Sequence, residues 1–427
     1  MRLCHARWLN PDGTFGEGAV EAPDGRLALR PGDEAGGGLD ARGLLVLPGL
    51  VDPHVHLRAP GLTRKEGVKN GSTAALAGGV TTLLAMPNDR PPTTTEARLD
   101  AKEAIYRRDC LTRWGLFLQA TPRAADPAFA ARMAPRVAGL KIYLARSSSL
   151  PALRDPALLT RILAAWPLVT VHAEDEGAFL PGPVDIRLMP HHVQRPVEAL
   201  GSALALVEAA LRALPPDGRP RLVVAHAATA LEAAWIARMK AEGFDVWGET
   251  CPHYLLFDSE QAEARGGELK VNPPLRAARD QEATRAALRE GTLDFLATDH
   301  APHLPAEKAD PANPPSGIAG IEWLWPLLLH QVEQGLLPWS GLTRVGCAAA
   351  AACYGLPGRD GLRDGNLADL VLAERPPEAP ARPVITRAAT NPYRHLPLAW
   401  RVRATFVGGR PAWRDPSLPP LPESPPP

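Results

Sequence analysis

The residues of this sequence best suited to chemistry are histidines at the ends of short apolar segments. His54 and His56 are separated by one residue, in Asp-Pro-His-Val-His. Alternate side chains of a strand project from the same face, so both imidazoles would point the same way. Such a pair can bind one metal ion, and it can equally be a pair of hydrogen-bonded surface histidines.

Three further side chains occupy comparable positions. His172 and His226 each end an apolar segment, and Asp299 follows Leu-Ala-Thr. A carboxylate at the end of an apolar strand is costly unless a cation or hydrogen bonds receive it. Any one of these could be an ordinary core or rim residue, but four histidines and one aspartate at four strand ends predict a metal site.

Lys141 stands inside the apolar segment Gly-Leu-Lys-Ile-Tyr. Burial disfavours the ammonium form and lowers the pKa of the amine. A neutral amine that faces two metal ions could react with carbon dioxide, and the two carbamate oxygens could then bridge the ions. The alternative is a lysine that reaches solvent at the barrel end or pairs with a carboxylate. Spacing alone leaves both interpretations open.

This set of residues predicts metal-assisted hydrolysis of an amide-like bond. Metal ions would polarise the carbonyl and supply a nucleophile near neutral pH. Asp299 could accept a proton and pass it to the leaving nitrogen. The sequence contains neither a GxSxG motif nor a GxxxxGK[ST] phosphate loop, and Cys251 lacks signs of activation. Nucleophilic serine or cysteine catalysis is therefore excluded.

Eight short apolar segments must position these side chains. They alternate with longer stretches of helical period, which indicates an α/β fold with a (β/α)8 TIM-like barrel; an open doubly wound sheet is the alternative. In a barrel the carboxyl ends of the strands meet at one mouth, where the polar residues would converge. The predicted strands are residues 49–57, 80–86, 114–119, 137–144, 168–173, 221–227, 245–250 and 293–298.

The two ends of the chain have a different character. Residues 1–48 and 362–415 contain short strand-like segments separated by Pro-Gly and Pro-Asp-Gly turns. We predict that both ends form one small β-sandwich domain, with the hydrolase barrel in residues 49–361. Residues 416–427 are rich in proline and are predicted to form a mobile tail.

The composition is that of a globular protein without a preference for polyanions. The 427 residues include 47 basic and 47 acidic side chains, and 45% are hydrophobic. A net charge of zero removes the driving force for general nucleic-acid or membrane-surface binding. Five widely spaced cysteines without a CxxC pair, no signal-peptide pattern and no apolar run of 18 residues predict a cytoplasmic protein.

From about Val46 to Gly409 the chain resembles the dihydroorotases of the amidohydrolase superfamily. Each matching motif alone is modest, but five motifs in the family's order are specific. The motifs are His54-Val55-His56-Leu57-Arg58, Gly78-Gly79-Val80-Thr81-Thr82 with Ala85-Met86-Pro87-Asn88, Gly139-Leu140-Lys141-Ile142-Tyr143, Lys270-Val271-Asn272-Pro273-Pro274-Leu275-Arg276, and Asp299-His300-Ala301-Pro302-His303.

The resemblance implies two Zn²⁺ ions per subunit, bridged by carboxylated Lys141. The other metal ligands would be His54, His56 and Asp299 on one ion, and His172 and His226 on the other. The substrate would be bound by donors that suit a carboxylate, which are Arg58, Asn88, Asn272 and His303.

The activity implied by the resemblance is that of a dihydroorotase. Such an enzyme interconverts N-carbamoyl-L-aspartate and L-dihydroorotate, by reversible zinc-dependent cyclisation, in de novo pyrimidine biosynthesis. Asp299 would move the proton. The resemblance allows a homodimer and a complex with aspartate transcarbamoylase, besides the small-molecule substrate. Neither a nucleic-acid nor a membrane partner is expected.

Some residues depart from the dihydroorotase pattern. Ala59 stands where a glutamate is usual, and the segment 249–254, Glu-Thr-Cys-Pro-His-Tyr, is closer to allantoinases and hydantoinases. Another cyclic amidohydrolase is therefore the near alternative, and an inactive scaffold for aspartate transcarbamoylase is an alternative of a different class. The retention of every metal-ligand position argues against the scaffold. The segment 146–149, Arg-Ser-Ser-Ser, is either a loop that closes on substrate or a generic surface turn.

Overall fold

The computed structural model describes residues 1–32, 37–146, 150–378, 384–389, 391–417, 419–420 and 423–424. Its larger part is a parallel barrel in the order β13-β12-β11-β10-β9-β8-β7-β6. Each of the eight predicted apolar segments overlaps one of these strands, so the predicted barrel is confirmed. The strands are β6 (Leu50–Val55), β7 (Val80–Ala85), β8 (Arg113–Gln119), β9 (Gly139–Tyr143), β10 (Leu168–His172), β11 (Arg221–Val224), β12 (Val246–Thr250) and β13 (Phe295–Leu296).

The first strand and the residues that follow the last strand close the barrel. His56 N donates to His300 O at 2.8 Å, and Asp52 accepts hydrogen bonds from Thr298 N (3.1 Å) and Thr298 Oγ1 (2.5 Å). Burial raises the pKa of Asp52 to about 7 even though these hydrogen bonds oppose the shift. Because Asp299 directly follows Thr298, this closure brings it beside the histidines of β6.

Helices cover the outside of the barrel and bury their apolar faces against it. Several begin at a side-chain cap: Thr95, Asp126, Asp155 and Thr229 each accept a hydrogen bond from the first helical turn. The longer helices are α1 (Val68–Ala77), α2 (Glu96–Asp109), α3 (Pro127–Met133), α4 (Pro156–Ala165), α6 (Val197–Arg212), α7 (Ala230–Ala241), α9 (Ser259–Arg265), α10 (Ala278–Glu290) and α12 (Leu324–Glu333). The shorter ones are α5 (His191–Gln194), α8 (Pro252–Leu256), α11 (Pro305–Lys308), α13 (Trp339–Thr343) and α14 (Ala349–Cys353).

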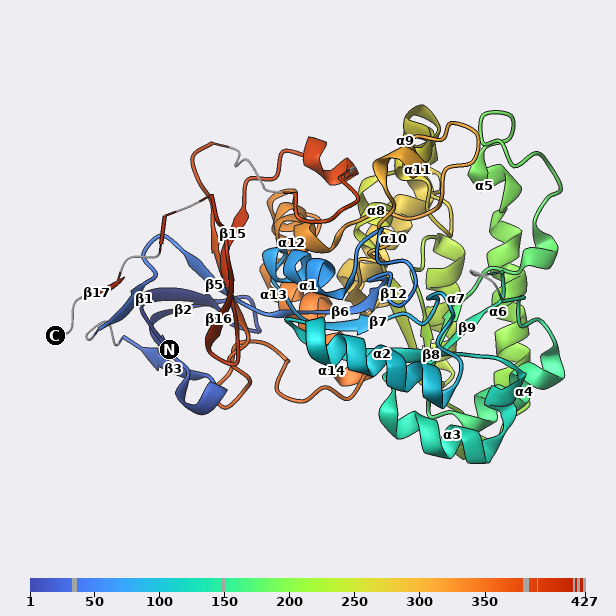
Figure 1. The fold of residues 1–427 in the computed structure, drawn as a ribbon, viewed down its shortest axis with the longest axis horizontal. Helices are drawn as coiled ribbons and strands as arrows, with labels where there is room; N and C mark the ends of the chain where they lie inside the picture. The colour runs from blue at the N-terminus through green and yellow to red at the C-terminus, as the bar shows by residue number, and fades with distance from the viewer. Residues whose placement is uncertain are drawn as a thin grey trace.

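The two ends of the chain share a mixed sheet beside the barrel (Figure 1). Its order is β16-β15-β14-β5-β1-β2-β3, with β4 paired to β1 and β17 paired to β4. The predicted fold class, a barrel with a small β-domain from both ends, is confirmed, while the boundaries at residues 48 and 362 stay predictions. The predicted tail falls partly outside the described residues. The strands are β1 (Arg2–Leu9), β2 (Phe15–Glu21), β3 (Ala28–Pro31), β4 (Gly38–Asp40), β5 (Leu45–Pro48), β14 (Leu370–Glu374), β15 (Arg401–Val407), β16 (Arg410–Arg414) and β17 (Glu423–Ser424).

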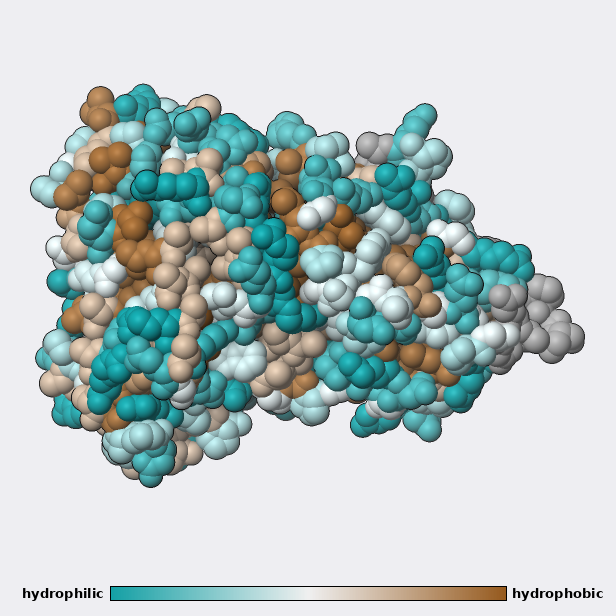
Figure 2. Space-filling model, turned by 180° about the vertical axis from the view of Figure 1, so that it is seen from behind, coloured by the Kyte–Doolittle hydropathy of each residue, from teal (hydrophilic) through white to brown (hydrophobic). Residues whose placement is uncertain are grey.

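The molecular surface mixes apolar and polar side chains. On the face in Figure 2 the apolar patches are separated by hydrophilic residues. Large apolar side chains that remain exposed include Leu180, Val184 and Leu188, which lie between β10 and α6. Scattered exposed residues of this kind are usual on protein surfaces. Within the described part of the chain, every helix is too short or too polar to cross a bilayer.

Candidate metal centre and substrate cavity

The predicted histidine pair at the end of β6 lies beside Asp299, which follows the last barrel strand, β13. His54 Nε2 and His56 Nε2 lie 3.4 and 2.9 Å from the same atom, Asp299 Oδ1. One ligand atom from each of the three residues lies within 4.8 Å of the others. Both imidazoles are buried. The structure therefore brings together three of the predicted metal ligands.

The other ring nitrogens of these histidines determine which lone pairs face Asp299. His54 Nδ1 donates to Glu249 Oε1 at 2.7 Å, and His56 Nδ1 donates to Asn88 Oδ1 at 2.6 Å. In this tautomer each Nε2 presents a lone pair to the Asp299 carboxylate, an arrangement that a cation between them stabilises. Burial lowers the pKa of His56 to about 4, against the attraction of Asp299, which disfavours a proton there. A metal ion fits this arrangement.

A second histidine pair lies across the ends of β10 and β11. His172 Nδ1 is 3.0 Å from His226 Nε2, and His172 Nε2 donates to Glu174 Oε2 at 2.9 Å. The His172 Nδ1 lone pair therefore faces the other ring. Two nitrogen ligands of one tetrahedral zinc ion lie roughly 3.3 Å apart. The His226 and His54 ring centroids are 5.3 Å apart, so the two pairs adjoin.

Lys141 on β9 is fully buried beside both groups. Among the described residues, its Nζ has no hydrogen-bond partner. Burial lowers the pKa of Lys141 to about 8, although Glu249 and Asp299 oppose the shift. Burial is the main cause of a lowered pKa at His226, and the nearby charge of Lys141 lowers it further. A buried amine without a hydrogen-bond partner is energetically costly, and its presence here fits the predicted carboxylation of the side chain.

Three site residues have a left-handed backbone conformation just beyond the end of a barrel strand. The φ angles are 59° at Arg58, 43° at His226 and 45° at Asp299. This conformation is uncommon for residues with a Cβ atom and concentrates at functional sites. It lets each residue leave the regular pleat of its strand where the barrel mouth begins.

A cavity of about 360 Å³ opens at this mouth. It is lined by all four predicted substrate-binding residues and by the four histidines predicted as metal ligands. Asp299 is the one carboxylate among the described residues that line it, whereas six lining side chains are cationic. These are Arg58, Arg64, Lys65, Arg90, Arg146 and Arg195. The excess of positive charge favours an anionic substrate.

His303 lies between two cations and a carbonyl at one side of the cavity. Lys65 Nζ donates to His303 Nδ1 at 3.0 Å, and His303 Nε2 donates to Ser316 O at 3.0 Å. Burial and the nearby charges of Arg58 and Lys65 lower the pKa of His303 to about 2. The ring is therefore neutral. Arg58 Nη2 lies 3.0 Å from His303 Nε2, so the two predicted substrate ligands adjoin.

Asn272 connects the cavity to the second histidine pair through Arg195. The Asn272 amide lies 2.7 Å from His191 Nε2, and with its nitrogen directed at that atom its oxygen accepts from Arg195 Nη1 at 3.2 Å. Arg195 also donates hydrogen bonds from Nε (3.1 Å) and Nη2 to the buried Glu174 carboxylate. Burial opposes ionisation of Glu174, but Arg195 and His172 outweigh it and hold its pKa far below the usual range.

Asn88 stands on a loop that a buried ion pair supports. Lys102 Nζ donates to Met86 O and to Asp89 Oδ2, each at 2.7 Å, and its side chain is fully buried. Residues 86–89 are thus held on both sides of Asn88, which keeps its oxygen against His56. A buried pair of this kind is costly to break because the remaining charge has no partner.

Some site residues were missed by the sequence analysis. Glu174 and Glu249 stand at the ends of predicted strands, so the rule that found the histidines could have found them. Arg195 lies on an irregular segment and carries no such signal. Arg146 lines the cavity, but Ser147–Ser149 of the predicted closing loop lie outside the described residues.

Replacing Glu249 with glutamine is expected to weaken metal binding by about 10- to 100-fold, because the His54 orientation loses its charged acceptor. Metal retained after dialysis against a graded chelator measures the effect, and circular dichroism checks the fold. Glu232→Gln is the matched control, since Glu232 is equally buried but contacts Ala228 N and Thr229. Equal metal retention in both variants would contradict the role of Glu249.

Comparisons with known proteins identify the family of the chain. Residues 45–144 match the amidohydrolase family. A dihydroorotase of Anaeromyxobacter dehalogenans (strain 2CP-1) is 34% identical, with 95% of each chain covered. A dihydroorotase of Shouchella clausii is 31% identical, with 88% of each chain covered. An allantoinase of Rubrobacter xylanophilus is 32% identical, with 91% of this chain and 87% of the relative covered.

Solved structures show the same architecture. An L-hydantoinase (dihydropyrimidinase) from Arthrobacter aurescens aligns with a TM-score of 0.83 at 25% identity, covering 97% of this chain and 96% of that one. A dihydropyrimidinase from Brevibacillus agri aligns with a TM-score of 0.79 at 22% identity, covering 97% and 95%. The second likeness concerns the fold alone.

Proposed function

The chain belongs to the amidohydrolase family, among its cyclic amidohydrolases, and from that premise we propose that it is a zinc-dependent dihydroorotase. The proposed reaction is the reversible cyclisation of N-carbamoyl-L-aspartate to L-dihydroorotate. The observation that carries the proposal is that two N–H donors, Arg58 Nη2 and His303 Nε2, lie 3.0 Å apart in a cavity whose charged lining residues are mostly cationic. A substrate ring that bears a carboxylate needs such donors, whereas an uncharged ring does not.

The donor set supports a pair of divalent metal ions. One ion would be held by His54, His56 and Asp299, and the other by His172 and His226. Lys141, once carboxylated, would bridge them. When bound, the ions polarise the amide carbonyl and lower the pKa of water. Nitrogen and oxygen donors of this type suit zinc, and they would also accept cobalt or manganese.

Asp299 is the residue we assign to proton transfer. In the ring-opening direction the acyl carbon gains the oxygen of water and the ring C–N bond breaks. The Asp299 carboxylate takes the proton from water and returns it to the leaving nitrogen. Cyclisation runs the same steps in reverse. His54 and His56 place their Nε2 atoms beside Asp299 Oδ1, and a shared metal ion would hold the carboxylate there.

Arg58 and His303 are assigned to the substrate carboxylate, with Asn88 and Asn272 on either side. Arg58 Nε donates to Pro302 O at 3.1 Å, which anchors the guanidinium before substrate arrives. An anchored donor loses less side-chain entropy when it binds. Charge-assisted hydrogen bonds of this kind contribute about 1.5–3 kcal/mol each.

The test is a comparison of kcat/KM for dihydroorotate, allantoin and hydantoin with the zinc-loaded enzyme. We expect dihydroorotate to be preferred by about tenfold or more, and Arg58→Met to remove most of that preference, since one such interaction is worth about a factor of ten to a hundred. Faster turnover of allantoin would overturn the assignment in favour of an allantoinase. Absence of both bound metal and turnover would favour a scaffold for aspartate transcarbamoylase.

A further inference from the structure

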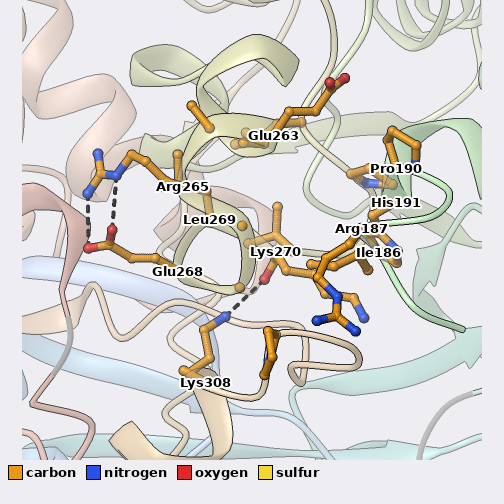
Figure 3. Close-up of a pocket in the computed structure, with 18 of the residues that line it drawn as sticks. Ile186, Arg187, Pro190, His191, Glu263, Arg265, Glu268, Leu269, Lys270 and Lys308 are labelled. Atoms are coloured by element: carbon orange, nitrogen blue, oxygen red, sulfur yellow. Dashed lines mark hydrogen bonds and ion pairs between the residues drawn. The ribbon is translucent and has the colours of Figure 1, made fainter.

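Lys308, at the end of α11, has a buried ammonium that no step above uses. Its side chain is 8% exposed and lines a second cavity, of about 590 Å³, drawn in Figure 3. Nζ lies 2.9 Å from Gly317 O, 3.0 Å from Pro315 O and 3.3 Å from Lys270 O. Among the described residues it forms no ion pair with a carboxylate. A buried amine bonded only to carbonyls is costly to charge, and burial lowers the pKa of Lys308 to about 7.

The three carbonyls belong to two segments that line the catalytic cavity. Residues 315–317 line it directly, and residues 270–272 end in Asn272, which also lines it. Gly317 N donates to Lys270 O at 2.8 Å, so the segments are already adjacent. Lys308 therefore holds both from the side away from the catalytic cavity, and its bond to the Lys270 carbonyl is visible in Figure 3.

The carbonyl between the two held by Lys308 faces the substrate site. Ser316 O accepts from His303 Nε2 at 3.0 Å, while the neighbouring carbonyls, Pro315 O and Gly317 O, accept from Lys308. Ser316 Oγ lies 3.1 Å from the Asn272 side chain. The ammonium thus fixes the peptide orientation that presents Ser316 to two of the residues assigned to substrate binding.

We propose that Lys308 is a positioning residue for substrate binding, which acts through Ser316 on His303 and Asn272. This inference rests on the proposed function for the identity of the substrate and for the assignment of His303 and Asn272 to its binding. The contacts of Lys308 lie on the substrate side of the site, so its loss should weaken substrate binding and leave metal binding intact.

The test compares Lys308→Met with Arg187→Met, which removes an exposed cation that lines the same second cavity. For Lys308→Met we expect KM to rise at least tenfold, kcat to change less than threefold, and zinc content to stay at the wild-type value. Arg187→Met should change none of these. A merely structural lysine would lower zinc content and kcat together. A folded Lys308→Met enzyme with wild-type KM would overturn the proposal, as would loss of zinc.

A second variant displaces the same segment while Lys308 itself is not replaced. At Gly317, with φ of 138°, an added Cβ would lie 2.5 Å from Ala301 O, so Gly317→Ala must displace residues 315–317. We expect the same rise in KM, and an unchanged KM would count against the proposal. Lys308→Gln, which keeps an N–H donor, should raise KM less than Lys308→Met, and if Lys308→Met does not fold, Gly317→Ala carries the test. KM is measured on whichever cyclic amide the wild-type enzyme hydrolyses, so failure of the dihydroorotase assignment is seen separately in the wild type.

Discussion

Lys141→Ala is expected to lower kcat by about a thousandfold or more, because loss of the proposed bridging ligand would remove several kilocalories per mole of metal-dependent stabilisation. The side chain is fully buried, and among the described residues its Nζ has no hydrogen-bond partner, so its removal breaks no hydrogen bond there. Zinc content should fall below two ions per chain. The measurements are kcat with dihydroorotate and metal analysis after gel filtration.

Chemical rescue sharpens this prediction. Alanine leaves a space in which a small carboxylate such as propionate could supply the two missing oxygens, so part of the activity should return at high propionate concentration. Lys141→Met fills the space with an apolar side chain and should show no rescue. Full zinc content and a wild-type rate in Lys141→Ala would establish that Lys141 is only a buried lysine.

Asp299→Asn is expected to lower kcat by about 10²- to 10⁴-fold, the usual contribution of a general acid–base group. The amide keeps the size of the carboxylate but cannot accept and return a proton. KM should change little, since Arg58 and His303 are untouched. Steady-state kinetics with the zinc-loaded variant give both constants.

The matched control for this variant is Asp294→Asn. Asp294 lies five residues earlier and forms an ion pair with Lys240 at 2.7 Å, so the same substitution there should affect stability without affecting kcat. An Asp299→Asn enzyme that keeps its zinc and more than a tenth of the wild-type kcat would show that another group moves the proton.

The parts of the site that follow strand geometry could be predicted from sequence. His54 and His56 share a face because strand side chains alternate, and His172, His226 and Asp299 converge because parallel strands end at one mouth. Periodicity also located each barrel strand, although β13 is shorter than the segment predicted for it, residues 293–298. After Leu296 the backbone leaves the strand ladder and Thr298 N donates to the Asp52 carboxylate instead, which spacing does not reveal.

What the sequence by itself determined is therefore the barrel, the positions of the candidate ligands at its strand ends and the type of hydrolase, since these depend on local period and on residue type. Only the tertiary structure decided which imidazole nitrogens face each other, that Arg195 reaches both Glu174 and Asn272, and that Lys308 holds the backbone at Ser316. Those contacts join residues on irregular segments, where no repeat relates sequence position to direction in space, and their partners are often backbone carbonyls that every residue carries.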